Sequence, residues 1–339
     1  MVTMQPSEPL YKQTSQYRNW RFSPEQLQEI RQSTHQAGVV RAQKNIQAER
    51  DELQQRSLPA PERTEGQVNY LSVEDELTLC NYYENIAENY ARHFKQPHLV
   101  KATAITFMKR FFLFNTVMDY PPKNIMLTCL YLATKTENRF IQIEDFVKPI
   151  PKVTAKDILD YEFTVCQGLK FEFTVHHPYS ALYGYFLDCQ SNIKSMALLT
   201  QVYNKAMDWC HKSIFTDLMF IYFPSQIALA CMKLAGQELV WDISGYLNEK
   251  FPDGNNVQRL DTMIDHITSV LKEYKSPTPN VARDIDRRLT FCRNPEKDPS
   301  RILYQKKQQW EQEQKSVDTP QGESSSRTET TDSSQEATK

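Results

Sequence analysis

Glycine is scarce in this chain, and its spacing excludes several kinds of site. The 339 residues include eight glycines, and no two of them lie closer than nine positions apart. The dinucleotide-binding pattern GxGxxG, the phosphate-binding loop GxxxxGK and the nucleophile elbow GxSxG all need closer glycines, so all three motifs are excluded. Few glycines together with long segments of helical periodicity indicate an all-α protein.

The seven cysteines lack the spacing of a metal site or a disulfide framework. No two form a CxxC pair, and most stand in apolar segments, where a thiol behaves as a small hydrophobic group. This pattern predicts free cysteines in a reducing compartment, the cytosol or the nucleus. His176 and His177 have no carboxylate or cysteine at ligand spacing, so we expect no bound metal and no cofactor.

Long apolar runs and a large net charge are also missing. The best apolar stretches, 125–133 and 218–223, fall far short of the ~18 residues of a membrane span. The net charge of −2 argues against a surface built for a phosphate backbone, which needs clustered basic residues. We therefore expect neither membrane insertion nor direct nucleic-acid binding.

Apolar residues are dense in the middle of the chain and thinly spaced at both ends. A chain of this length is expected to hold about two domains. A helix start is predicted at Ser23, a good N-cap followed by Pro24, and a C-terminal stripe is predicted from Val281, Ile285 and Leu289. The expected regions are a disordered start and N-terminal helical extension (1–56), a linker (57–72), a first helical unit (73–174), a second (175–275), a C-terminal helical extension (276–315) and a disordered tail (316–339).

The central part contains an internal repeat at an offset of 102 residues, the distance from Pro122 to Pro224. Six residues of one expected helix recur in another at this offset: Pro122, Ile125, Leu127, Cys129, Leu132 and Ala133 return as Pro224, Ile227, Leu229, Cys231, Leu234 and Ala235. The same offset aligns two further helices without a gap. The repeat predicts a tandem of two five-helix units.

The two units differ in charge at two aligned positions. Lys135 falls on Gln237, and Glu162 falls on Ile264. Lys135 is near the end of an expected helix, where free carbonyls and the dipole favour a cation. Glu162 lies among apolar residues at helical spacing, and a carboxylate there is costly to bury unless it is paired. Copies that share a fold but differ in charge usually differ in binding, so these two residues form a candidate binding pair. A helix cap or an internal ion pair without a binding role is the alternative.

The order of these features resembles the cyclins. The pattern L-A-x-K near the end of the third helix, with a glutamate 27 residues later in the fifth, resembles the cyclin box, and five plus five helices resemble the double cyclin fold. A more specific resemblance is to the cyclin H group, the regulatory cyclins of CDK-activating kinases. It is carried by SQYRNWRFS (15–23), LTLCNYYEN (77–85), FMKRFFLFNTVMDYPPKNIMLTCLYLATKTE (107–137), VHHPY (175–179) and YFPSQIALA (222–230).

The resemblance implies a non-catalytic subunit that binds and activates a cyclin-dependent kinase. It matches Lys135 and Glu162 with the pair that grips the kinase beside its αC helix. The other residues it assigns to the kinase-binding site are Leu132, Cys166, Phe173 and Glu137. It also implies a RING-containing assembly factor and general transcription factor IIH as partners, phosphorylation of the RNA polymerase II C-terminal domain, and a nuclear location.

Two departures and one rival interpretation accompany this resemblance. Glu76 stands where the docking motif of cell-cycle cyclins usually has an arginine, so we do not expect substrate docking there. Thr136 stands where several cyclins have an aromatic residue, so we expect a shallower kinase pocket. The second unit lacks the charged pair, so we expect it to hold the assembly factor on a mainly apolar, uncharged surface. The rival is a double cyclin fold of the transcription factor IIB type, which binds promoter DNA and carries a zinc ribbon ahead of a basic core. No cysteine precedes Cys80 in this chain. An all-α metal-dependent enzyme is a third option without a motif in its favour.

Overall fold

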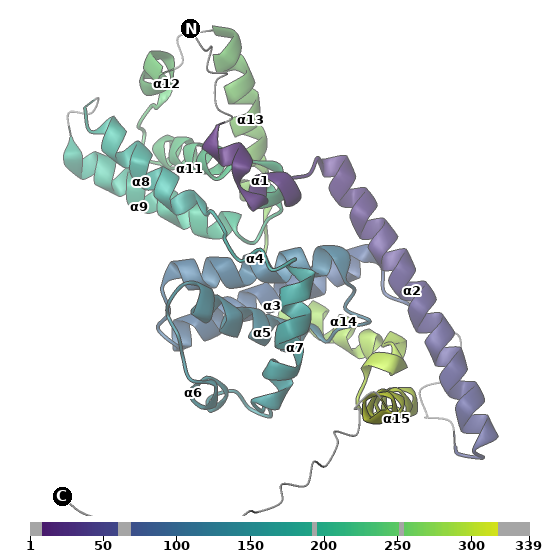
Figure 1. Cartoon of the computed structure of the whole chain (residues 1–339). Coiled ribbons are helices and arrows are strands. Elements are labelled where there is room, and N and C mark those ends of the chain that lie inside the picture. Colours follow the sequence, from purple (N-terminus) through teal and green to yellow (C-terminus); the bar gives the residue numbers. More distant parts are fainter. Residues whose placement is uncertain (1–8, 60–68, 192–194, 251–253, 318–339) are drawn as a thin grey trace, which may run out of the picture.

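The computed structural model describes residues 9–59, 69–191, 195–250 and 254–317 (Figure 1). Within these ranges the chain forms helices and no strands, which confirms the predicted all-α class. The first unit consists of α3 (Val73–His93), α4 (His98–Phe114), α5 (Pro122–Thr136), α6 (Ile143–Val147) and α7 (Lys156–Gly168). The second unit consists of α8 (Pro178–Cys189), α9 (Met196–Ser213), α11 (Pro224–Glu238), α12 (Ser244–Lys250) and α13 (Gly254–Glu273), with a short α10 (Leu218–Ile221) before α11.

The central helix of each unit explains why the repeat is so regular. Residues 125–134 of α5 are all buried, and 227–232 of α11 are buried in the same way. Both helices begin with a proline at the first helical position, Pro122 and Pro224, where the missing amide hydrogen costs nothing. The other helices of each unit pack around this apolar cylinder, so the aligned apolar residues form the two cores.

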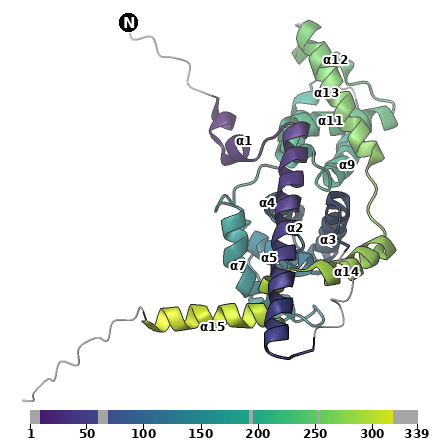
Figure 2. The ribbon, with the colours of Figure 1, turned by 90° about the vertical axis from the view of Figure 1, so that its right-hand side faces the viewer.

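The flanking segments pack on both units and on one another. They are η1 (Leu10–Gln13), α1 (Ser15–Asn19) and α2 (Pro24–Gln55) before the two units, and α14 (Pro279–Cys292), η2 (Pro295–Lys297) and α15 (Ile302–Val317) after them. Figure 2 shows α2 crossing the length of the molecule, from the second unit down to α15. The predicted start of α2 is confirmed, since the Ser23 and Gln26 side chains form a capping box.

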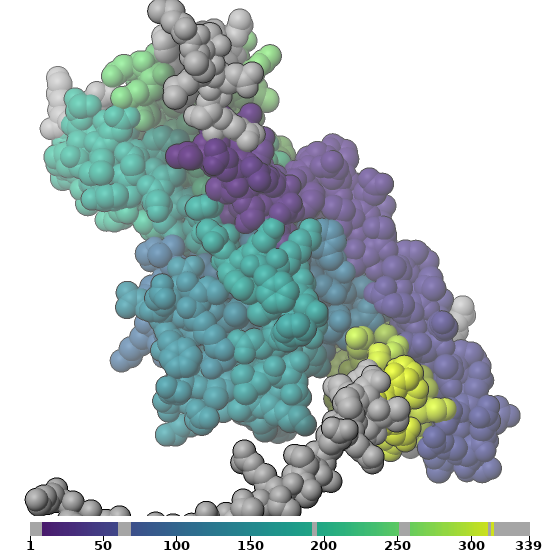
Figure 3. All heavy atoms as spheres, in the orientation of Figure 1, coloured from purple at the N-terminus to yellow at the C-terminus, as the bar shows by residue number. Residues whose placement is uncertain are grey.

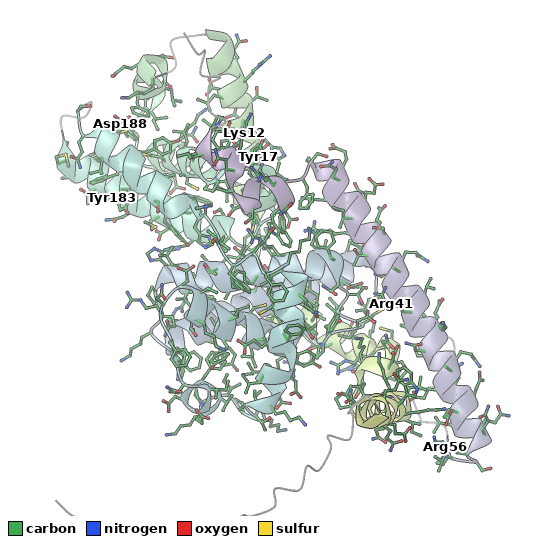
Figure 4. All side chains as sticks on the ribbon, viewed as in Figure 1. Lys12, Tyr17, Arg41, Arg56, Tyr183 and Asp188 are labelled. Carbon is green, nitrogen blue, oxygen red and sulfur yellow. The ribbon has the colours of Figure 1, made fainter. Side chains whose placement is uncertain are left out.

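Ion pairs fix α2 along its length. The Arg31 guanidinium donates two hydrogen bonds of 2.8 Å to Asp217, just before α10. Arg41, labelled in Figure 4 near the middle of α2, donates to Asp119 after α4 at 2.5 Å. Gly38 lies between them, and a Cβ at this position would clash with the Thr116 side chain. The helix therefore needs glycine where it approaches the first unit most closely.

Two expectations about the flanking segments need correction, and one concerns residues that mostly lie outside the described ranges. Residues 10–13 and 15–19 form helical turns, although a disordered start was predicted; residues 1–8 are outside the described ranges. Val281 is 48% exposed, and Ala282 takes its place on the buried face of α14. Most of the tail, 318–339, is also outside the described ranges. None of the helices in those ranges combines the length and apolar character needed to cross a membrane.

Candidate functional site

The end of α5 places Lys135 at the surface of the first unit. The backbone N–H of Glu137 bonds to the Ala133 carbonyl, and Asn138 adopts a left-handed φ of 54° that stops the helix. Asn is one of the few side chains that tolerates this conformation, which explains why no glycine is needed. The lysine therefore emerges from the last turn, where helix carbonyls favour a positive charge.

Lys135 and Glu162 form an ion pair between α5 and α7. The Lys135 Nζ donates to Glu162 Oε1 at 2.5 Å, and the same ammonium lies 4.4 Å from the centre of the Tyr131 ring. The two side chains are 33% and 23% exposed, so the pair is compensated yet still reaches solvent. Such a pair can offer its remaining hydrogen-bonding atoms to the backbone of a partner.

The predicted apolar residues lie around this pair at different depths. Leu132 is only 5% exposed and belongs to the hydrophobic core of the molecule, one turn before Lys135 on α5. Cys166 and Phe173 are half-buried and offer part of their surface. Burial, and then the Glu162 carboxylate, raise the pKa of the Cys166 thiol, so this cysteine is a neutral packing group here.

Glu137 belongs to a different hydrogen-bond network. It accepts a bond of 2.6 Å from the Thr103 hydroxyl on α4, and that hydroxyl lies 2.9 Å from His177 Nε2. Burial of the His177 ring, together with nearby Arg110, lowers its pKa to about 3, so the imidazole is neutral. Glu137 thus ties the end of α5 to the start of the second unit.

Two exposed aromatic residues beside the charged pair were not predicted. Phe163 is 64% exposed and Phe171 is 55% exposed. Their ring centres lie 6.1 Å apart, and Phe171 lies 6.3 Å from Phe173. We call these three rings, Phe163, Phe171 and Phe173, the aromatic patch. It continues from Glu162 along α7 and the segment that follows it.

The aligned surface of the second unit is charged. The offset of 102 places Asp261 on Leu159 and Asp265 on Phe163, and these aspartates lie 2.9 and 3.5 Å from the Lys233 ammonium. Our expectation of an uncharged surface is therefore wrong for α11 and α13. The alignment of the two units could have revealed Phe163 from the sequence, because the first unit has an aromatic residue at this position and the second unit has an aspartate.

A cavity elsewhere in the molecule offers no alternative metal site. It measures about 540 Å³ and is bounded by α2, α3, α4 and α13 together with the segment around α10. Glu76 lines it but is already bonded to His35 at 2.6 Å and to the Val117 N–H at 3.0 Å. Burial raises the pKa of Glu84 to about 7, although Lys109 at 3.1 Å opposes the shift. The described residues contain no group of His, Cys, Asp and Glu that could hold a metal ion.

Comparisons with known proteins identify the fold. Residues 68–174 match the family described as cyclin, N-terminal domain, and residues 177–275 match the cyclin C-terminal domain. The chain is 32% identical to cyclin mcs2 of Schizosaccharomyces pombe over 88% of this chain and 89% of the relative. It belongs to the cyclin family. Its relatives include proteins named cyclin H, as the sequence predicted.

Two solved structures resemble the whole of this cyclin or most of it. A chain in the CAK complex of Chaetomium thermophilum, bound to ATP-γ-S, is similar with a TM-score of 0.77 and 26% identity, covering 96% of this chain and all of that one. A chain in the yeast TFIIK complex, Kin28/Ccl1/Tfb3, is similar with a TM-score of 0.60 and 32% identity, covering 77% of this chain and all of that one. The double cyclin fold that the resemblance implied is confirmed.

Proposed function

We propose that this cyclin is the regulatory subunit of a CDK-activating kinase and works within general transcription factor IIH. The similarity to chains of the CAK and TFIIK complexes supports this assignment. The single observation that carries it is the surface of α5 and α7. There the first unit combines a solvent-reaching ion pair, Lys135–Glu162, with the exposed rings of Phe163 and Phe171, where the aligned positions of the second unit carry Asp265 and no matching ion pair.

This surface is suited to gripping a helix of the kinase. Lys135 and Glu162 supply donors and acceptors for backbone groups, while Phe163, Phe171 and Phe173 supply apolar area of the kind that dominates binding energy. Cys166, close to Glu162 and Lys135, is half-buried and adds apolar surface, whereas Leu132 is buried. The contact would hold the kinase αC helix inward, which completes the internal Lys–Glu pair that aligns ATP.

The cyclin itself does no chemistry in this mechanism. It lowers the free energy of the active kinase conformation because it binds that conformation more tightly than the inactive one. The expected output is phosphorylation of protein substrates, including the RNA polymerase II C-terminal domain, in the nucleus.

A third subunit would bind the second unit. The yeast TFIIK complex, one chain of which resembles this protein, includes a third chain, Tfb3. Exposed apolar residues of the second unit lie on α8, where Tyr183 is 51% and Leu187 is 47% exposed. We place the RING-containing assembly factor on residues 178–275 for this reason. Hydrogen exchange protection gained only within 73–171 on its binding would contradict that placement.

Reconstitution with the purified catalytic subunit of a CDK-activating kinase tests the function directly. The proposal requires that the full chain bind this kinase and raise its activity on a peptide substrate. A chain that leaves the kinase inactive but binds promoter DNA with a steep salt dependence would support the transcription factor IIB type instead.

A further inference from the structure

The segment from Gln16 to Phe22 lies between the two units and bonds to both. Figure 3 shows α1 in the seam between the upper and lower parts of the molecule. The Gln16 side chain donates to the carbonyl of His176 at 3.1 Å and accepts from its N–H at 2.7 Å. The Phe22 N–H donates to the Phe220 carbonyl at 2.8 Å.

Aromatic contacts strengthen the attachment to the second unit. The Arg21 guanidinium lies 3.8 Å from the centre of the Phe223 ring, and Tyr17, labelled in Figure 4, stacks on the same ring at 5.7 Å. A cation over an aromatic face and a stacked pair of rings are both favourable contacts. The segment is therefore a fixed part of the fold.

The same segment is attached to the first unit through the carboxylate of Glu172. Asn19 Nδ2 donates to its Oε1 and the Trp20 indole Nε1 to its Oε2, each at 2.5 Å. The backbone carbonyl of Glu172 accepts from Arg110 at 3.1 Å, and that guanidinium lies over the Trp20 ring at 4.7 Å. Trp20 is 1% exposed, so these bonds are shielded from water. Glu172 is thus held by three donors from two parts of the chain.

Glu172 directly follows a backbone conformation that is costly to hold. Lys170 and Phe171 have φ values of 55° and 57°, in the left-handed region that side chains other than glycine seldom adopt. Such residues persist only where their surroundings fix them. The Phe171 N–H bonds to the Cys166 carbonyl at 2.9 Å and closes the turn locally. Glu172, bonded through both its carboxylate oxygens and its backbone carbonyl, adds a second constraint from outside the turn. The conformation turns Phe171 outward, next to Phe163 and Phe173.

We propose that Asn19 and Trp20 are positioning residues for kinase binding, which act through Glu172 to hold Phe171 in its exposed orientation. The inference deepens the proposed function and rests on it. It makes the N-terminal segment a support of the kinase-binding surface without requiring that it touch the kinase.

Trp20→Phe is the most selective test, because it keeps an aromatic ring and removes one hydrogen-bond donor. The kinase dissociation constant would be measured by calorimetry for the full chain, the variant, Phe171→Ala and the double variant, with thermal unfolding in parallel. We expect Trp20→Phe to weaken kinase binding about 5- to 10-fold, the scale of one typical hydrogen bond, because the effect reaches the kinase only through Phe171. In the Phe171→Ala background the same change should cost less than about 2-fold, because the two residues act through one contact.

Trp209→Phe is the matched control. Its indole also donates to a glutamate, Glu238 Oε1 at 3.0 Å, but it lies in the second unit. This variant should leave kinase affinity unchanged. Asn19→Ala removes the other side-chain donor to Glu172 and keeps the test open if Trp20→Phe does not fold. It should weaken binding about 3-fold, again only while Phe171 is present.

The outcomes separate the two proposals. If Phe171→Ala leaves kinase affinity unchanged, the kinase-binding surface is wrongly assigned. Suppose instead that Phe171→Ala weakens kinase binding. The positioning role is then refuted if Trp20→Phe alone leaves the affinity unchanged. It is also refuted if Trp20→Phe lowers the affinity by the same factor in the Phe171→Ala background as in the parent. A purely structural role would lower the unfolding temperature equally in both backgrounds without this dependence of affinity on Phe171.

Discussion

Phe163→Asp tests whether the aromatic patch is a binding surface, because the protein already carries an aspartate at the aligned place. The second unit has Asp265 there and keeps the same fold. Phe163 is 64% exposed, so its replacement removes little internal packing. We therefore expect the unfolding free energy to change by no more than about 0.5–1 kcal/mol, the usual effect of a surface change with a small loss of helix propensity.

The effect on kinase binding should be much larger. A phenylalanine buries about 200 Å² when fully covered, and 64% exposure leaves roughly 130 Å² available to a partner. At about 25 cal/mol per Å² this area is worth at most ~3 kcal/mol. Only part of the free energy calculated from buried area appears as binding free energy, because association has its own costs. We therefore expect about half of this value, which corresponds to a loss of roughly 10- to 15-fold in affinity.

The assay is titration of the kinase with each variant, followed by activity at saturating cyclin. Leu187→Asp on α8 is the control, since Leu187 is 47% exposed in the second unit, away from α5 and α7. Equal kinase affinities for Phe163→Asp and the parent would refute the assignment of the patch. So would an equal loss for Leu187→Asp, because that result would indicate a non-specific effect of surface charge.

Two further predictions concern the flanks and the acid stability. Deleting 1–56 should reduce kinase activation more than deleting 316–339, because α2 and the Glu172 contacts are lost; equal losses in the same kinase assay would contradict this. His177 has its pKa lowered to about 3, so the unfolded state binds more protons below pH 6.5 and stability falls as pH falls. Between pH 7.5 and 5.5 the free energy of unfolding, measured in urea, should fall by about 1.4 kcal/mol because of His177. In the His177→Gln variant this part of the pH dependence should be absent. A variant with the parent's full pH dependence would show that His177 is protonated in the folded state.

Much of the fold was predictable because it follows from apolar periodicity. The ten main helices arise from stripes that each unit repeats, and Pro122, Pro224 and Ser23 mark helix starts by local chemistry. The turns that tie the units together were not predictable in this way. Helix α1 has five residues and no stripe, and it is held by distant partners such as Glu172 and His176.

The candidate site was only partly predictable. A charged residue within an apolar stripe is conspicuous, so Lys135 and Glu162 could be found from the sequence. An exposed phenylalanine looks like a core residue in the same stripe, so Phe163 and Phe171 were missed. Val281 shows the same ambiguity, since periodicity gives the face of a helix only to within one neighbouring position.

The Lys135→Ala/Glu162→Ala variant tests the central claim most directly. Both members of the pair are removed together, so no unpaired charge remains half-buried, and the fold should melt within a few degrees of the parent. Kinase activation at a fixed, subsaturating concentration is then measured, with Lys233→Ala/Asp261→Ala in the second unit as the matched control. The account predicts at least about a 10-fold loss of activation for the first-unit variant and little change for the control. Full activation by the Lys135→Ala/Glu162→Ala variant would contradict it.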